Sequence, residues 1–171
     1  MKTLRLTRHA KSSWTRPELD DRERGLNKRG RRDLPRMAAA LSARLEPSII
    51  HASPARRAQL TLEGLCAHWP ALAQLPHVSD EDLYTFAAAD LLDWLAQRPD
   101  TTPDAWIIGH NPALTSLVNH LAPGAGLDNL PTCGFVELQL GVDHWDQLMQ
   151  GAAKVTTRLF PKQLRDPDTE K

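Results

Sequence analysis

The residues best suited to chemistry in this chain are histidines and arginines that stand at or soon after the ends of short apolar segments. They are Arg8, His9, Arg57 and His110. A neutral imidazole can attack phosphorus as a nucleophile, and the planar, permanently charged guanidinium group can hold a pair of phosphoryl oxygens. Two cations and two imidazoles around a space the size of an anion therefore predict a phosphate site that contains its own nucleophile.

Three apolar stretches indicate the strands that must position these side chains, at residues 3–7, 48–52 and 105–108. Ligands of an open α/β sheet lie outside the carboxyl ends of its strands, so the side chains converge if these strands are neighbours. Ser53-Pro54 and Asn111-Pro112 follow the second and third strands. Because Ser or Asn can cap a helix and Pro suits its first position, we expect helices to begin at these dipeptides.

Further segments complete an alternating pattern of strands and helices. Asn27 is placed to cap a helix, residues 87–97 have helical spacing, and residues 134–140, 144–148 and 154–160 are predicted to be strands that extend the sheet. This order predicts an α/β three-layer sandwich with a mostly parallel central sheet flanked by helices.

Length and hydropathy limit the organisation of the chain. Its 171 residues are typical of one domain, so we expect a single domain at residues 1–164 and a short flexible tail at 165–171. No apolar run approaches the ~20 residues that cross a bilayer, and the N-terminus does not resemble a secretory signal. A cytoplasmic monomer with no membrane partner is the expectation.

Charge is distributed unevenly along the chain. Residues 1–62 contain 15 Lys and Arg against 6 Asp and Glu, whereas residues 63–153 contain 1 against 12. Positive charge in the segment that carries the chemistry favours an anionic substrate, and the neutral total argues against a nucleic-acid binder. The two cysteines lack the spacing of metal ligands.

Four motifs, in order along the chain, resemble those of the histidine phosphatase superfamily, which is also called phosphoglycerate mutase-like. L-T-R-H-A at residues 6–10 resembles the R-H-G signature, and R-G-L-N-K-R-G at 24–30 resembles R-x-L-x-x-x-G. S-P-A-R-R-A-Q-L-T at 53–61 resembles S-P-x-x-R-A-x-x-T, and residues 109–112 read G-H-N-P. The second motif and the compact length resemble the SixA branch, whose members are phosphohistidine phosphatases.

This resemblance implies a phosphoglycerate mutase-like fold without a large helical insertion, with His9 as the nucleophile. The residues that it implies for binding the phosphate are Arg8, Arg24, Ser53, Arg57, His110 and Asn111. No metal and no other cofactor is implied. Ala10 departs from the pattern, because the family has Gly there. The insertion that carries the general acid in mutase-like members is also missing, so Glu81 is our first candidate for the acid, with Asp82 and Asp21 as alternatives.

The predicted function is hydrolysis of a phosphoryl group through a covalent phosphohistidine intermediate. A weak or missing acid favours phosphohistidine in a protein as substrate, because its leaving group needs less help than an alkoxide. The predicted partner is a phosphohistidine-bearing phosphotransfer domain docked over residues 16–32. Two alternatives stay open, a small-molecule phosphomonoesterase and a non-catalytic adaptor that binds phosphorylated proteins.

Overall fold

The computed structural model describes residues 1–164, and the expected tail lies outside the described residues. The strands are β1 (Lys2–Arg8), β2 (Ile50–Ala52), β3 (Val78–Ser79), β4 (Asp104–Gly109), β5 (Phe135–Leu140) and β6 (Ala153–Leu159). The α-helices are α1 (Lys28–Ser42), α2 (Arg56–Ala67), α3 (Pro70–Ala73), α4 (Ala88–Ala96) and α5 (Ala113–Leu121). Short 3₁₀ helices are η1 (Asp21–Glu23), η2 (Glu81–Leu83), η3 (Pro123–Ala125), η4 (Trp145–Gln147) and η5 (Pro161–Gln163).

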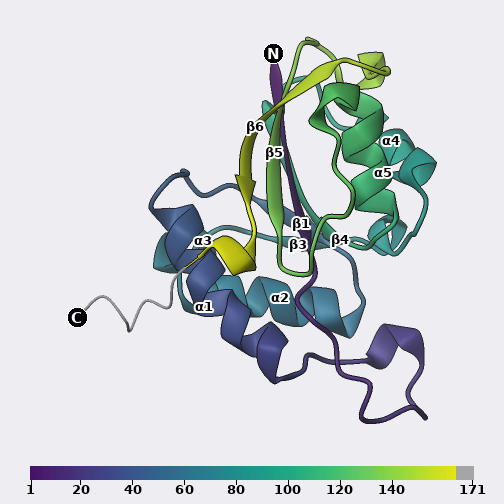
Figure 1. Ribbon diagram of the computed structural model, residues 1–171. Coiled ribbons are helices and arrows are strands. Elements are labelled where there is room, and N and C mark those ends of the chain that lie inside the picture. Colours follow the sequence, from purple (N-terminus) through teal and green to yellow (C-terminus); the bar gives the residue numbers. More distant parts are fainter. Residues whose placement is uncertain (165–171) are drawn as a thin grey trace.

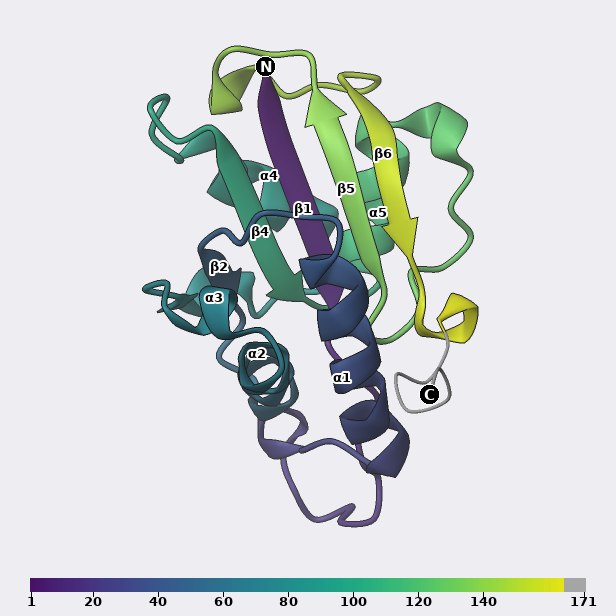
Figure 2. The ribbon, with the colours of Figure 1, turned by 90° about the vertical axis from the view of Figure 1, so that its left-hand side faces the viewer.

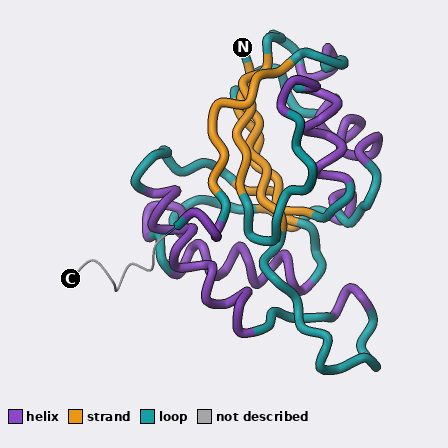
Figure 3. Tube along the Cα trace, in the orientation of Figure 1, coloured by secondary structure: helices purple, strands orange, loops and turns teal. Residues whose placement is uncertain are grey.

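The strands form one mixed sheet in the order β3-β2-β4-β1-β5-β6. β3, β2, β4 and β1 run parallel, and β5 is antiparallel to both of its neighbours. Arg8 at the end of β1 pairs with Gly109 at the end of β4, and Ala52 of β2 pairs with Ile108. The carboxyl ends of these three strands therefore lie side by side, and the loops that follow them lie below the sheet in Figure 3.

Helices cover both faces of the sheet, which confirms the predicted three-layer sandwich. α4 and α5 pack on one face and α1, α2 and α3 on the other (Figures 1 and 2). Successive side chains of a strand point to opposite faces. Ile107 accordingly packs in the core beneath α4 and α5, and its neighbours Trp106 and Ile108 pack in the core beneath α1 and α2.

The first turn of α1 packs directly on the segment that follows the first strand. Asn27 caps the helix as expected, since its side chain accepts the backbone N–H of Gly30 at 2.8 Å. A Cβ atom on Gly30 would lie 2.3 Å from the carbonyl oxygen of Lys11. Only glycine leaves room for this close approach, which explains the last position of the R-x-L-x-x-x-G motif.

One predicted strand is wrong, because residues 144–148 contain the 3₁₀ helix η4 and no strand. Trp145 and Leu148 are three residues apart, and this spacing places both on one side of a 3₁₀ turn. Trp145 is fully buried, and its indole N–H donates to Thr102 O at 2.9 Å. A turn thus buries Trp145 and packs Leu148, which is partly buried, against the same core.

The predicted starts of two helices are also wrong. α2 begins at Arg56, because Ser53 belongs to a turn in which its hydroxyl oxygen accepts the N–H of Ala55 at 3.2 Å. α5 begins at Ala113, after Pro112. Asn111 still supports α5 from outside the helix, since its side-chain oxygen accepts the N–H of Thr115 at 3.1 Å.

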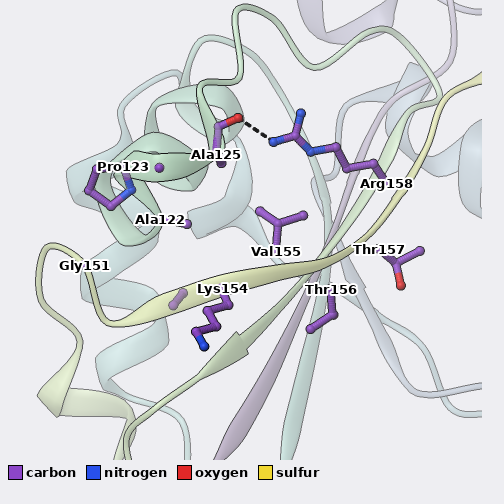
Figure 4. A pocket seen from close by; sticks show the side chains of 11 residues that line it. Ala122, Pro123, Ala125, Gly151, Lys154, Val155, Thr156, Thr157 and Arg158 are labelled. Carbon is purple, nitrogen blue, oxygen red and sulfur yellow. Dashed lines mark hydrogen bonds between the residues drawn. The ribbon is translucent and has the colours of Figure 1, made fainter.

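A hollow of about 730 Å³ lies between η3 and the edge strand β6 (Figure 4). Arg158 crosses part of it and donates to Ala125 O at 2.6 Å. None of the candidate site residues lines this hollow. Within residues 1–164 no helix has the length and apolar character needed to span a bilayer.

Candidate active site

His9 and His110 meet at the edge of the sheet where β1 and β4 end. The backbone N–H of His9 donates to Gly109 O at 3.1 Å, so each histidine is the first residue beyond its strand. Their ring centroids are 5.2 Å apart, and both side chains are buried. The neighbouring strands thus bring together two imidazoles that are about a hundred residues apart in the sequence.

One hydrogen bond determines which nitrogen of His9 is free to react. Nδ1 lies 2.8 Å from Ala10 O, and a carbonyl oxygen can only accept, so Nδ1 carries the proton. Nε2 then presents a lone pair. Burial, with a smaller contribution from the nearby His110, Arg57 and Arg8, lowers the pKa of His9 to about 3 against the opposing effect of the bond to Ala10. His9 is therefore neutral at physiological pH, the form that attacks phosphorus.

Ala10 fits its position although the family has glycine there. Its N–H donates to the hydroxyl oxygen of Thr61 at 2.9 Å, and that hydroxyl donates to Arg57 O at 2.7 Å. Ala10 is fully buried, and Cys133 is the sole residue other than glycine with a positive φ within residues 1–164. The backbone at Ala10 therefore does not require glycine, and Thr61 of α2 holds the loop that follows β1.

Arg57 and His110 form a fixed pair in the interior of the site. Arg57 projects from the first turn of α2 and donates from Nη2 to Nδ1 of His110 at 3.3 Å. Since a guanidinium group only donates, Nε2 of His110 holds the proton and donates to Ser53 Oγ at 2.8 Å. Burial and the charge of Arg57 lower the pKa of His110 to about 4.

Arg24 reaches the same region from a loop, and Arg8 reaches it from the last position of β1. Arg24, which follows η1, donates to Ser12 Oγ at 2.8 Å and to Asp21 Oδ1 at 2.9 Å. Arg8 donates to Leu130 O at 3.0 Å. Burial and the neighbouring Arg57 lower the pKa of Arg8. The Nε atoms of Arg8, Arg24 and Arg57 are buried without a hydrogen-bond partner among residues 1–164, so each guanidinium group keeps donors that no described protein group uses.

Asp21 holds two of these arginines in place. Its backbone oxygen accepts from Arg57 at 2.6 Å, and its carboxylate accepts from Arg57 and Arg24, both at 2.9 Å. The hydroxyl of Tyr84 donates to the same carboxylate at 2.5 Å. Burial would raise the pKa of Asp21, but these hydrogen bonds outweigh it and hold the pKa well below its usual range.

Two residues that were expected in the site have other partners. Glu81 lies in η2, where its exposed carboxylate accepts from Arg22 at 2.9 and 2.5 Å, and Arg22 lowers its pKa. The side-chain nitrogen of Asn111 donates to Asn129 Oδ1 and Leu130 O, both at 3.0 Å. Asn111 thus connects the start of α5 to the loop that holds Arg8.

Three aromatic residues at the site were not expected from the sequence. Tyr84 and Phe86 each have a ring centroid 5.4 Å from that of His110, and Trp14 packs on Arg24 with 3.6 Å between the guanidinium carbon and the ring centroid. The aromatic residues at 84 and 86, next to the acidic run 80–82, were the sequence signal available. The sequence does not show that this segment returns to His110.

The described part of the chain contains no group of three or more His, Cys, Asp or Glu residues that could hold a metal ion. Cys66 and Cys133 are not paired with each other. Arg8, Arg24 and Arg57 place three positive charges beside His9 and His110.

A neutral imidazole beside three guanidinium groups and a second imidazole, at the carboxyl ends of parallel strands, can hold a phosphoryl group and offer it a nitrogen nucleophile. The model of the histidine phosphatase superfamily, branch 1, matches residues 4–91, more than half of the chain, and the chain belongs to this family. No curated protein sequence matches it.

Solved structures show the same fold at low sequence identity. The phosphohistidine phosphatase SixA of Agrobacterium tumefaciens has a TM-score of 0.75 and 22% identity, covering 94% of this chain and 98% of its own. A SixA from Nakamurella multipartitia has a TM-score of 0.78 and 21% identity, covering 94% and 96%. A mycobacterial glucosyl-3-phosphoglycerate phosphatase has a TM-score of 0.66 and 14% identity, covering 92% and 98%. The fold is thus phosphoglycerate mutase-like, as the motifs implied.

Proposed function

We propose that the protein is a metal-independent phosphatase that transfers a phosphoryl group to Nε2 of His9 and then to water. The observation that carries this proposal is the hydrogen bond from His9 Nδ1 to Ala10 O, which leaves Nε2 unprotonated beside Arg8 and Arg57. A surface histidine without these contacts would have neither a fixed tautomer nor neighbouring guanidinium groups.

In the proposed reaction the Nε2 lone pair attacks phosphorus in line with the leaving group. The bond from phosphorus to Nε2 forms as the bond to the leaving atom breaks, while Arg8, Arg24 and Arg57 hold the equatorial oxygens and His110 keeps Arg57 in place. Water then attacks phospho-His9, and the imidazole leaves with its lone pair. Positioning and charge neutralisation by fixed donors supply most of the rate enhancement, so no metal is needed.

We further propose phosphohistidine in a protein as the substrate, with a phosphotransfer domain as its bearer. Hydrogen bonds keep the pKa of Asp21 and of Glu81 below the usual range, so both carboxyl groups are ionised at neutral pH and hold no proton to donate. An alkoxide leaving group needs such a proton, whereas the nitrogen of phosphohistidine needs it far less. The higher TM-scores of the SixA structures, one of which holds tungstate, support the same choice.

The second candidate is a phosphatase of small phosphomonoesters. The structural similarity to a glucosyl-3-phosphoglycerate phosphatase favours it. In this case Glu81 or Asp82 would move into reach and serve as the acid. A non-catalytic adaptor would bind phosphoproteins through the same arginines without forming phospho-His9.

Enzyme kinetics in excess EDTA separate these candidates. We expect kcat/KM to fall steeply from aryl to alkyl phosphates while a phosphohistidine peptide stays reactive, and we expect ³²P to label the wild type but not His9→Ala. Loss of activity on chelation, restored by Mg²⁺ or Zn²⁺, would contradict metal independence. Alkyl phosphatase activity that disappears in Glu81→Gln or Asp82→Asn would establish the small-molecule phosphatase, and binding without any label would establish the adaptor.

A further inference from the structure

Two of the large apolar side chains that are exposed on this protein lie against residues of the phosphate site. Trp14 is 68% exposed and covers the guanidinium group of Arg24, and Phe86 is 48% exposed and packs beside the ring of His110. Exposed aromatic surface is costly in water, and it often marks a binding site. Both rings therefore lie where they can contact whatever is attached to a bound phosphoryl group.

Tyr84 contacts Phe86 on one side and Asp21, which holds Arg24 and Arg57, on the other. These contacts fix the position of the Tyr84 ring. The rings of Tyr84 and Phe86 have centroids 5.7 Å apart, and the Tyr84 hydroxyl donates to Asp21. On the other side, the guanidinium carbon of Arg22 lies 5.6 Å from the centroid of the Tyr84 ring. We call Trp14, Tyr84 and Phe86 the aromatic rim. Because Tyr84 is held at its hydroxyl and its ring contacts, this part of the rim is organised before substrate binds.

The residues of the phosphate site are buried and the aromatic rim is partly exposed, and this difference indicates the direction in which a substrate extends. His9, Arg24, Arg57 and His110 are between 2% and 7% exposed, so the small, anionic phosphoryl group occupies the inner end of the site. The rest of the substrate must extend outward, past side chains that are both exposed and in contact with these ligands. Phe86 meets both conditions at His110.

We infer that the aromatic rim is the leaving-group subsite and that it binds a flat, apolar-faced ring such as the imidazole of phosphohistidine or an aryl group. This inference rests on the proposed function and specifies its substrate class. Aromatic rings favour offset or edge-to-face packing with one another, which Phe86 and Tyr84 offer from one side of the site. A polyhydroxylated leaving group would need several hydrogen-bond partners, but the hydroxyl hydrogen of Tyr84 is already donated to Asp21 and the ring of Phe86 has no polar atom.

The test compares leaving groups with and without a ring in the same variants. 4-Nitrophenyl phosphate and a phosphohistidine peptide carry a ring, and acetyl phosphate and phosphoramidate do not. For Phe86→Ala we expect kcat/KM to fall about 3- to 10-fold with the ring substrates and to change less than about 2-fold with the others, on the scale of one aromatic contact. Taking the ratio of variant to wild type for each substrate cancels the intrinsic reactivity of its leaving group.

Two further variants control for the fold and for exposure. Phe86→Tyr keeps the ring and should retain wild-type ratios. Met149→Ala also removes an exposed apolar side chain, since Met149 is 65% exposed. Met149 lies just before β6, at the end of the sheet where β1 begins and therefore away from His9. This variant should affect no substrate. Equal losses on all substrates would mean that Phe86 acts by orienting His110, and the inference would be wrong.

Other results also decide the matter. A loss confined to the phosphohistidine peptide would identify Phe86 as a contact for the polypeptide rather than for the ring, and no loss on any substrate would remove it from the site. Both results would overturn the inference while the wild type stays active. Failure of the proposed function looks different, because the wild type would then turn over none of the substrates or His9→Ala would retain activity.

Discussion

Burial and a single hydrogen bond give His9 a chemistry that an exposed histidine lacks. The ring is enclosed, Nδ1 is used by Ala10 O, and the pKa is lowered to about 3 from the ordinary value of 6.5. His110 is lowered to about 4 for similar reasons, with burial as the largest cause and Arg57 next. At the residue scale, the site therefore consists of neutral imidazoles among permanent cations.

The lowered pKa values of His9 and His110 predict that the folded protein loses stability as the pH falls. The unfolded chain takes up protons on both imidazoles below pH 6.5, whereas the folded protein resists until about pH 3 to 4. The unfolded state thus binds more protons in this window, so the free energy of unfolding should fall as the pH falls through it. NMR titration of the His9 ring, with urea-unfolded protein as the reference, measures the difference. A folded-state midpoint near 6.5 would contradict it.

Neighbouring arginines on α2 should differ sharply in their importance. Arg57 is 2% exposed and contacts both His110 and Asp21, whereas Arg56 is exposed. We expect Arg57→Ala to lower kcat/KM about 10²- to 10³-fold, the scale of losing a principal donor to the transition state, and Arg56→Ala to stay close to wild type. Thermal unfolding of both variants checks that the fold is intact. Similar kinetic effects would mean that the direction of Arg57 is unimportant.

At the scale of elements, the sequence predicts best the features that depend on a short, continuous stretch of residues. The strands that end near residues 8, 52 and 109 and the cap at Asn27 were predicted, because each depends on a few adjacent residues. The predictions of a strand at 144–148 and of the starts of α2 and α5 were wrong. These segments have partners that lie far along the chain: Trp145 donates to Thr102, Ser53 accepts from His110, and Asn111 donates to Leu130.

The site shows the same division. Sequence motifs indicated Arg8, His9, Arg24, Arg57 and His110, since each stands at a recognisable spacing. The aromatic rim and the bracing role of Asp21 follow from tertiary contacts. Asp21 contacts side chains 36 and 63 residues away, and no local pattern records such contacts.

The close contact between α1 and the loop that follows β1 gives a prediction for Gly30. Alanine there would place Cβ 2.3 Å from the backbone oxygen of Lys11, and this clash should outweigh the gain in helix propensity. We expect Gly30→Ala to destabilise the protein by about 1–3 kcal/mol, as overpacking does, and to lower activity. Gly124→Ala is the matched control, because no atom lies within 4 Å of the added Cβ. Urea unfolding measures both, and equal stabilities would show that the loop can move aside.

On the scale of the whole molecule, positive charge is concentrated in the part of the chain that supplies most of the candidate site. Residues 1–62, which carry the excess of Lys and Arg, supply β1, η1, α1, β2 and the start of α2. The acidic segment 63–153 supplies α4 and α5, which cover the opposite face of the sheet. A chain that is neutral in total can thus attract an anion to one region.

This arrangement predicts that salt weakens the encounter with substrate more than the chemical step. Raising ionic strength from about 0.01 M to about 0.15 M shortens the screening length from about 30 Å to about 8 Å. We expect kcat/KM for a phosphorylated substrate to fall over this range while kcat changes little, because the buried arginines are screened less. Steady-state kinetics at several salt concentrations test this. A fall in kcat alone would contradict it.

The edge strand β6 has a consequence for self-association. An exposed edge can pair with the same edge of a second copy, the usual route to edge-to-edge aggregation. If two copies of β6 paired in antiparallel fashion about Thr156, Lys154 of one copy would stand opposite Arg158 of the other. Both side chains are exposed, and like charges directly opposite each other destabilise a strand pair. The charges of β6 therefore disfavour the pairing of its edge with a second copy, and hence the growth of a fibre.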